Sequence, residues 1–173
     1  MDKSLISEAA RCLRVLDVYQ RDAVVKLSDD YDPVSESQDV AIQYRVRPID
    51  FEMLTISNDD NPDSESKIGR FKTACGIRLV ASTDKEEEPK VLCEITTEFI
   101  SDYAVVDNIS ELSSLKEFGL YNAPYHIWPY FREFIHNTCL RSRLPLVTIP
   151  MYHLPDNHGN EEIKKDDETL EES

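Results

Sequence analysis

The sequence has 173 residues, and 40% of them are hydrophobic, which suits one domain with its own core. Its net charge of −15 argues against nucleic acid and against an anionic membrane as partners, because both would repel the chain. No apolar run reaches the length of a membrane span, and the start, MDKSLISEAARC, lacks the layout of a signal peptide. We therefore expect a cytoplasmic protein without stable membrane insertion.

The four cysteines are far apart in the sequence and form no CxxC pair. Two of them lie in apolar segments that have the character of a core. This usage indicates reduced thiols rather than a disulfide framework or a zinc site. The residues concerned are Cys12, Cys75, Cys93 and Cys139.

The N-terminal segment has the spacing of an amphipathic helix over about residues 4–16. Either Ser4 or Ser7 is placed to cap its start. Alternation and β-branched residues then predict that a strand begins between Leu13 and Val18. The apolar side of the predicted helix consists of Leu5, Ile6, Ala9, Cys12, Leu13 and Leu16.

Three further segments carry strand patterns, at 40–57, 67–82 and 90–105. Pro48 interrupts the first of them, which indicates an edge strand or a bulge. Four strands at hairpin spacing predict an antiparallel meander within an α+β fold. Polar stretches that read as loops or turns separate the strands, at 29–39, 58–66 and 83–89.

From Ser110 onward the periodicity is helical. The stretch SELSSLKEFGLYNA predicts a short helix that ends at Gly119, the usual left-handed stop. Proline in a helix interior costs about 3 kcal/mol. Pro124 and Pro129 therefore predict a broken first turn, followed by a firm helix over about 129–140.

The C-terminal part cannot continue this helix, because Pro145 and Pro150 interrupt it. The stretch LPLVTIPMYHL is predicted to be extended and apolar. From Asp156 the sequence is acidic and lacks aromatic residues, which is typical of disorder. We expect one domain over 1–155 and a disordered acidic tail over 156–173.

The stretch WPYFREFIHNTCLRSRLPLVTIP resembles the helix signature of the SecB export-chaperone family. VLCEI in the last predicted strand also matches that family, and VYQRDAVV matches its first strand more weakly. The resemblance covers roughly residues 13–152. The predicted N-terminal helix, and the lack of a helix after the proline-rich extension, look more like divergent SecB-like proteins, some of which serve toxin–antitoxin modules. The residues of the helix signature are Pro129, Tyr130, Arg132, Glu133, Leu144, Pro145 and Pro150.

This resemblance implies a four-stranded antiparallel sheet with a long helix on one side. It also implies a homotetramer, a dimer of dimers, that holds nonnative polypeptides without ATP or another cofactor. The positions that match the family's docking face for the SecA motor are Asp22, Leu92 and Glu94. Lys26 stands where the family has a further acid, so binding of SecA stays open.

A protein that holds unfolded chains needs accessible apolar surface within a charged surround. The candidates for client binding are Phe51, Leu54, Ile56, Tyr125 and Trp128. Aromatic residues at helical spacing are more often core than binding surface. The family places its long helix at the contact between dimers, so we assign Phe131, Arg132 and Glu133 to the oligomer interface, with a core position as the alternative for Phe131.

No part of the sequence assembles a nucleophile with its base, so we do not expect an enzyme. The motif HLPDNH spaces two histidines around an aspartate, but a position near the terminus disfavours a metal site. Two functions therefore stand. One is a general chaperone for nonnative polypeptides, and the other is a dedicated adaptor for one partner such as an antitoxin. The number of clients distinguishes the two functions, because a general chaperone acts on several unrelated denatured proteins and an adaptor acts on one.

Overall fold

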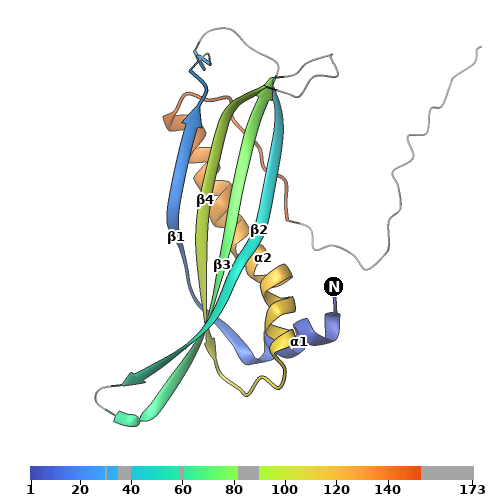
Figure 1. The fold of residues 1–173 in the computed structure, drawn as a ribbon, viewed down its shortest axis with the longest axis vertical. Coiled ribbons are helices and arrows are strands. Elements are labelled where there is room, and N and C mark those ends of the chain that lie inside the picture. Colours follow the sequence, from blue (N-terminus) through green and yellow to red (C-terminus); the bar gives the residue numbers. More distant parts are fainter. Residues whose placement is uncertain (30, 35–39, 59–60, 82–89, 153–173) are drawn as a thin grey trace, which may run out of the picture.

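The chain forms an α+β fold in which one long helix crosses one face of a four-stranded antiparallel sheet (Figure 1). The computed structural model describes residues 1–29, 31–34, 40–58, 61–81 and 90–152. The fold class predicted from the sequence is confirmed. The predicted tail at 156–173 and the acidic turn at 83–89 lie outside the described residues. The elements are α1 (Lys3–Cys12), β1 (Leu13–Leu27), β2 (Val40–Asn58), β3 (Asn61–Ala81), β4 (Val91–Val105) and α2 (Leu112–Arg141).

The strand order is β1-β4-β3-β2, with every pair antiparallel. Only β2, β3 and β4 follow one another as a meander, and β1 pairs with β4 instead of β2. The prediction of a complete meander is therefore wrong at β1. Hairpin spacing assumes that neighbours in sequence pair, but here the chain passes from one edge of the sheet to the other between Leu27 and Val40. Tyr31 on this path is buried in the core.

The hairpin of β2 and β3 is longer than predicted, because the polar stretch at 58–66 mostly continues the strands. Pairing of β3 with β4 ends at Ile68 and Ala104. Beyond that pair, β2 and β3 pair only with each other, and the hairpin projects from the sheet (Figure 1). The described side chains at 55–57 and 65–67 in this part of the hairpin are exposed.

Helix α1 is shorter than predicted and has a different cap. The carboxylate of Asp2 accepts hydrogen bonds from the backbone N–H groups of Ser4 and Leu5, at 2.9 and 3.3 Å, so neither predicted serine is the cap. The helix ends at Cys12 because Leu13 is already extended. Glu8 fixes α1 to the start of α2 by accepting hydrogen bonds from Ser110 and Ser114.

Helix α2 is continuous over 30 residues, so the predicted stop at Gly119 and break before Pro129 are wrong. The two prolines lack the N–H groups that would bond to the carbonyl groups of Leu120 and Tyr125. Both of these residues lie on the exposed side of the helix, where water can satisfy the freed oxygens. Within the described chain, neither helix is both long and apolar enough to cross a membrane.

Two clusters of buried side chains lie between α2 and the sheet. The larger surrounds Ile95, Ile127 and Ile135, and the smaller joins α1, the sheet and the first half of α2 around Phe71 and Phe118. The burial gained along this whole interface offsets the cost of two internal prolines, because each fully buried large apolar side chain contributes about 1.5–3 kcal/mol.

All four cysteines are free and buried, whereas the sequence placed only two of them in core-like segments. Burial raises the pKa of Cys75 to about 12 and that of Cys93 to about 11. Both therefore remain neutral thiols at physiological pH, and they serve as small apolar side chains of the core.

Candidate functional site

An open apolar groove of about 400 Å³ lies between β2 and the first half of α2. Phe51 of β2 and Phe71 of β3 form its aromatic side, and Leu115 and Leu120 of α2 form the opposite side. Gly119 lies between these two leucines on the helix. An ideal Cβ at this position would stand 2.7 Å from Cδ1 of Phe71, so only glycine lets α2 approach the ring this closely.

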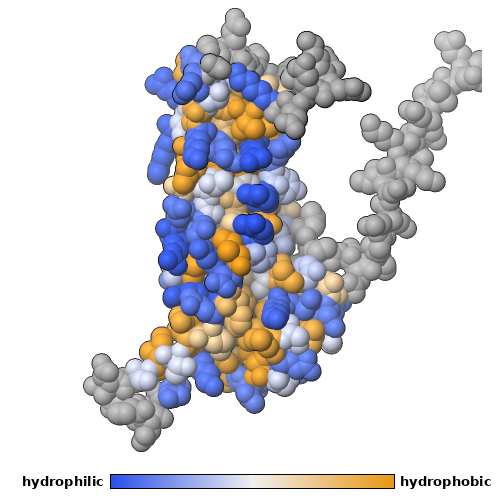
Figure 2. Space-filling model, in the orientation of Figure 1, coloured by the Kyte–Doolittle hydropathy of each residue, from blue (hydrophilic) through white to orange (hydrophobic). Residues whose placement is uncertain are grey.

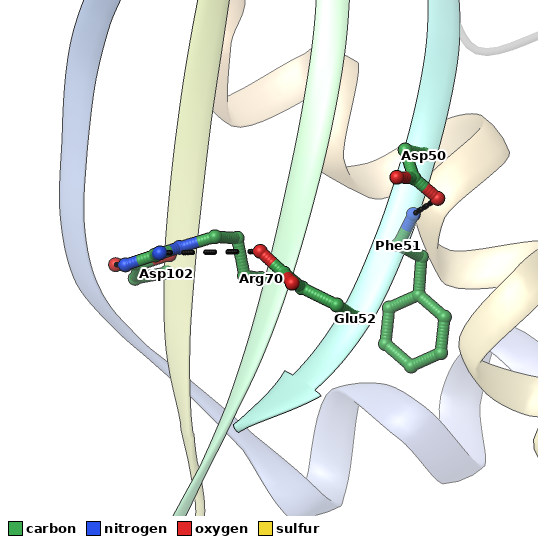
Figure 3. Close-up of polar contacts among 5 residues, drawn as sticks. All are labelled: Asp50, Phe51, Glu52, Arg70 and Asp102. Carbon is green, nitrogen blue, oxygen red and sulfur yellow. Dashed lines mark hydrogen bonds and ion pairs between the residues drawn. The ribbon is translucent and has the colours of Figure 1, made fainter.

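The β2 side of the groove has the features of a protected edge strand. Its register shifts between Pro48 and Asp50, and Pro48 has no backbone N–H to donate. The carboxylate of Asp50 accepts the N–H of Phe51 at 2.8 Å (Figure 3). This stretch is therefore poorly suited to pairing with an added strand, and a ligand in the groove would be held mainly by its apolar side chains.

The aromatic side of the groove rests on a fixed set of rings. Phe51 packs on Phe71 with ring centroids 5.0 Å apart, and Phe71, Tyr103 and Phe118 pack on one another at 5.1–5.6 Å. The Tyr103 hydroxyl and His126 Nδ1 share a hydrogen bond of 2.9 Å. Burial raises the pKa of Tyr103 to about 12 and lowers the pKa of His126, so both favour their neutral forms at neutral pH.

The residues predicted to bind clients do not form one surface. Phe51 lines the groove, and Figure 3 shows its ring turned toward the helices. Glu52 lies on the opposite face of the sheet, and because side chains alternate along a strand, Leu54 and Ile56 lie on that opposite face as well. Tyr125 is 52% exposed on α2 and packs against Tyr152 instead of reaching the groove.

The structure contradicts the prediction that Trp128 is accessible. Its side chain is only 4% exposed, and its ring packs between Tyr44, Phe131 and Tyr152. The indole Nε1–H donates a hydrogen bond of 2.8 Å to the carbonyl oxygen of Pro150. The expected bend before this residue does not exist, because α2 is continuous there.

Of the two positions expected for Phe131, the core and the subunit interface, the structure shows the core, since this side chain is fully buried within its own subunit. Arg132 and Glu133 lie on the outside of α2. Arg132 donates to Met151 Sδ at 3.0 Å, and Glu133 accepts from Asn137 on the next turn. Their role in an oligomer interface stays a prediction.

Charged side chains lie on the face of the sheet that is turned away from α2, among them Glu52, Arg70 and Asp102 (Figure 3), and the space-filling view shows hydrophilic residues mixed with hydrophobic ones (Figure 2). Arg70 donates two hydrogen bonds of 2.8 Å to Asp102 and lies 3.9 Å from Glu52. These hydrogen bonds raise the pKa of Arg70 above its ordinary value. Lys72 pairs with Glu98 at 2.8 Å on the same face, so opposite charges alternate across neighbouring strands.

Two of the three predicted docking residues lie on this charged face. Asp22 is opposite Glu98 in the register of β1 and β4, and Glu94 is opposite Lys26. Glu94 also accepts a hydrogen bond of 2.7 Å from Arg78. Leu92 is only 3% exposed, which contradicts its expected accessibility. A docking role for the two acids stays a prediction.

Several residues of the groove were not identified from the sequence, namely Phe71, Leu115, Gly119 and Leu120. The signal is the spacing of Leu115 and Gly119, which lie one turn apart on the same face of a helix only if that helix continues through Gly119, with Leu120 at the edge of that face. Among the described residues, no group of three or more His, Cys, Asp and Glu could hold a metal ion. The predicted HLPDNH motif, at 153–158, lies outside those residues.

No family model matches the sequence, and no curated protein matches it either. The structure, in contrast, is similar to solved structures. One is the Rv1957 SecB-like chaperone of Mycobacterium tuberculosis, in complex with a ChAD peptide from the Rv1956 HigA1 antitoxin. The TM-score is 0.61 at 13% sequence identity, and the match covers 89% of this chain and 100% of that chain. The chain therefore has the fold of a SecB-like chaperone.

Proposed function

We propose that this protein is an ATP-independent chaperone that holds nonnative polypeptide segments in the open groove between β2 and α2. The observation that carries this proposal is the groove itself, an accessible apolar surface on a chain with a net charge of −15. Soluble proteins keep such surfaces mainly where a partner binds, and like charge keeps the complex in solution. The shared fold with a chaperone solved with an antitoxin peptide supports a polypeptide as the ligand.

The size of the groove limits what one subunit can do alone. Each large apolar side chain that it buries contributes about 1.5–3 kcal/mol. Micromolar affinity requires about 8 kcal/mol, so two such side chains in one groove are not sufficient. A client chain that occupies the grooves of several subunits gains affinity through high effective concentration. This argument favours an oligomer as the active form.

We propose a homotetramer, a dimer of dimers, and the surface that supports it is the free edge of the sheet at β1. Helix α2 packs mainly over β2, β3 and β4, and β1 lies at the edge of the sheet. A long edge strand with exposed apolar side chains favours pairing with another chain. Its exposed apolar residues are Val15, Leu16, Tyr19, Val24, Val25 and Leu27.

A dedicated adaptor for one partner is the second candidate, and the antitoxin peptide bound by the similar chaperone favours it. An export role would use Asp22 and Glu94 to dock the SecA motor. Lys26 and Arg78 beside Glu94 reduce the negative charge there, which disfavours a basic partner. We place either activity in the cytoplasm, where four free thiols remain reduced.

The test is suppression of aggregation with several unrelated, chemically denatured proteins, each mixed with the full chain without ATP. A general chaperone suppresses the aggregation of all of them at near-stoichiometric ratios. A dedicated adaptor suppresses that of at most one and instead binds a particular partner protein tightly. If the chain neither suppresses aggregation nor binds any unfolded polypeptide at micromolar concentration, the proposed function is wrong.

A further inference from the structure

The segment that follows α2 runs back along the helix as an extended chain (Figure 1). Its start is fixed by the N–H of Leu144, which donates to the carbonyl of Cys139 at 2.9 Å. Six residues later, Pro150 accepts the hydrogen bond from Trp128. Six extended residues span about 20 Å, and α2 rises about 16 Å between residues 128 and 139, so the segment is antiparallel to the helix.

This segment has the contacts of a bound peptide. Leu144, Val147 and Ile149 are buried, whereas Leu146 and Thr148 between them are exposed. Among the described residues, two side chains of α2 donate hydrogen bonds to this segment. The Trp128 indole donates to the backbone carbonyl of Pro150, and Arg132 donates to Met151 Sδ. Alternating apolar anchors with sparse polar contacts are the way in which a protein binds an extended, apolar polypeptide.

The end of this segment packs on α2 beside β2, and these two elements also form the open groove. The ring of Tyr44 on β2 packs on that of Trp128 with centroids 6.0 Å apart, and the ring of Tyr152 packs on Trp128 with centroids 5.1 Å apart. Trp128 lies about 12 Å beyond Leu120 along the helix, and Tyr44 lies about 13 Å from Pro48 along the strand. The two spacings are similar, so the covered section around Trp128 lies further along the same two elements that form the open groove.

We infer that the client-binding groove has a second section with Trp128 at its floor, and that residues 149–152 form a displaceable strap over this section. An extended apolar segment of a client replaces the strap, and one of its backbone carbonyl oxygens accepts the Trp128 Nε1–H in place of Pro150. Leu144 and Val147 remain in the core and keep the strap attached. This inference rests on the proposed function, and it specifies how the binding site is extended and regulated.

The strap lowers client affinity, because a client must compete with a segment held nearby by the chain itself. Weakening the strap therefore strengthens client binding, which is the opposite of what removal of a binding residue does. Tyr152→Ala removes the ring that covers Trp128. Leu146→Ala is the matched control, because it shortens an exposed side chain of the same segment.

The experiment titrates full-length chains with fluorescein-labelled, reduced and alkylated ribonuclease A, an unfolded probe without tryptophan. We expect Tyr152→Ala to bind about five- to tenfold more tightly than the wild type, and Leu146→Ala to bind like the wild type. The indole N–H resonance of Trp128, the one tryptophan of the chain, shifts at saturation in all three. Equal or weaker binding by Tyr152→Ala, or an unmoved indole resonance, overturns the strap while leaving the proposed function intact. If none of the chains binds the probe, the proposed function fails, and the strap fails with it.

Discussion

Gly119 of α2 lies directly against the ring of Phe71 of β3. A Cβ on this glycine would stand 2.7 Å from Cδ1 and 2.9 Å from Cε1 of that ring. The ring cannot easily move aside, because it is buried and packs on Phe51, Tyr103 and Phe118. The glycine thus sets the distance between helix and sheet at the groove.

Replacing this glycine by alanine should destabilise the protein. Alanine gains about 1 kcal/mol of helix propensity over glycine, but overpacking of a core costs about 1–3 kcal/mol. We expect Gly119→Ala to lower the free energy of unfolding by up to about 2 kcal/mol in urea denaturation. A net stabilisation, as expected for the same change on an open helix surface, would show that the contact with Phe71 is loose.

The pair of Arg70 and Asp102 should contribute more to stability than the other ion pairs of the charged face. Asp102 is buried and accepts both hydrogen bonds, so Asp102→Ala should cost about 1.5–3 kcal/mol. Glu94→Ala removes the more exposed pair with Arg78 and should cost under about 1 kcal/mol. Equal unfolding midpoints of the two variants in urea would contradict this ranking.

Stability should fall in mildly acidic solution because of His126. Burial holds its pKa below the ordinary value of 6.5, so the unfolded chain binds a proton at a pH where the folded protein does not. Its stabilising effect is complete above pH 6.5 and is lost as the pH falls toward the lower pKa of the folded state. We expect the urea midpoint to drop between pH 7.5 and 5.5.

The matched variant for this effect is His126→Gln, which keeps a polar partner for Tyr103 but cannot titrate. Its urea midpoint should change less than that of the wild type over the same pH interval. If both proteins lose the same stability, another group is responsible and the assignment to His126 is wrong.

The oligomer should have a mass of about 80 kDa, four times the 19.9 kDa of the chain. Leu16→Asp places a charge on the free edge of β1 and should lower the mass measured by light scattering, because an unpaired carboxylate is costly to bury. Val34→Asp adds the same charge at an exposed position outside the sheet and should leave the mass unchanged. A wild-type chain that is monomeric at all concentrations would rule out the tetramer.

Period-two alternation and the change to helical spacing near Ser110 were sufficient to predict the four strands and the helices that pack with them. The strand order was not predictable, since local patterns do not show that β1 pairs across the sheet with β4. The continuity of α2 was missed because the cost of Pro124 and Pro129 is visible in the sequence. The burial that offsets it, for example at Ile127, depends on the folded sheet.

The candidate site was predicted only in part, for a similar reason. Phe51 was identified as a candidate in the strand that Pro48 interrupts, but its partners on α2 became visible only with a continuous helix. Helical spacing could not separate Tyr125, which is exposed, from Trp128, which is covered. What covers Trp128 is a segment about twenty residues further along the chain, and no local pattern indicates that contact.

The central claim is that the open groove binds nonnative polypeptide, and the most direct test is the affinity of two matched leucine variants for an unfolded polypeptide. Leu120 lines the groove and is 47% exposed, whereas Leu112, at the start of the same helix, is 58% exposed and does not line the groove. Losing one buried leucine contact costs about 1.5–3 kcal/mol, so Leu120→Asp should weaken binding about tenfold or more. Leu112→Asp should bind like the wild type. Equal affinities for Leu120→Asp and the wild type, with both proteins folded, would contradict the account.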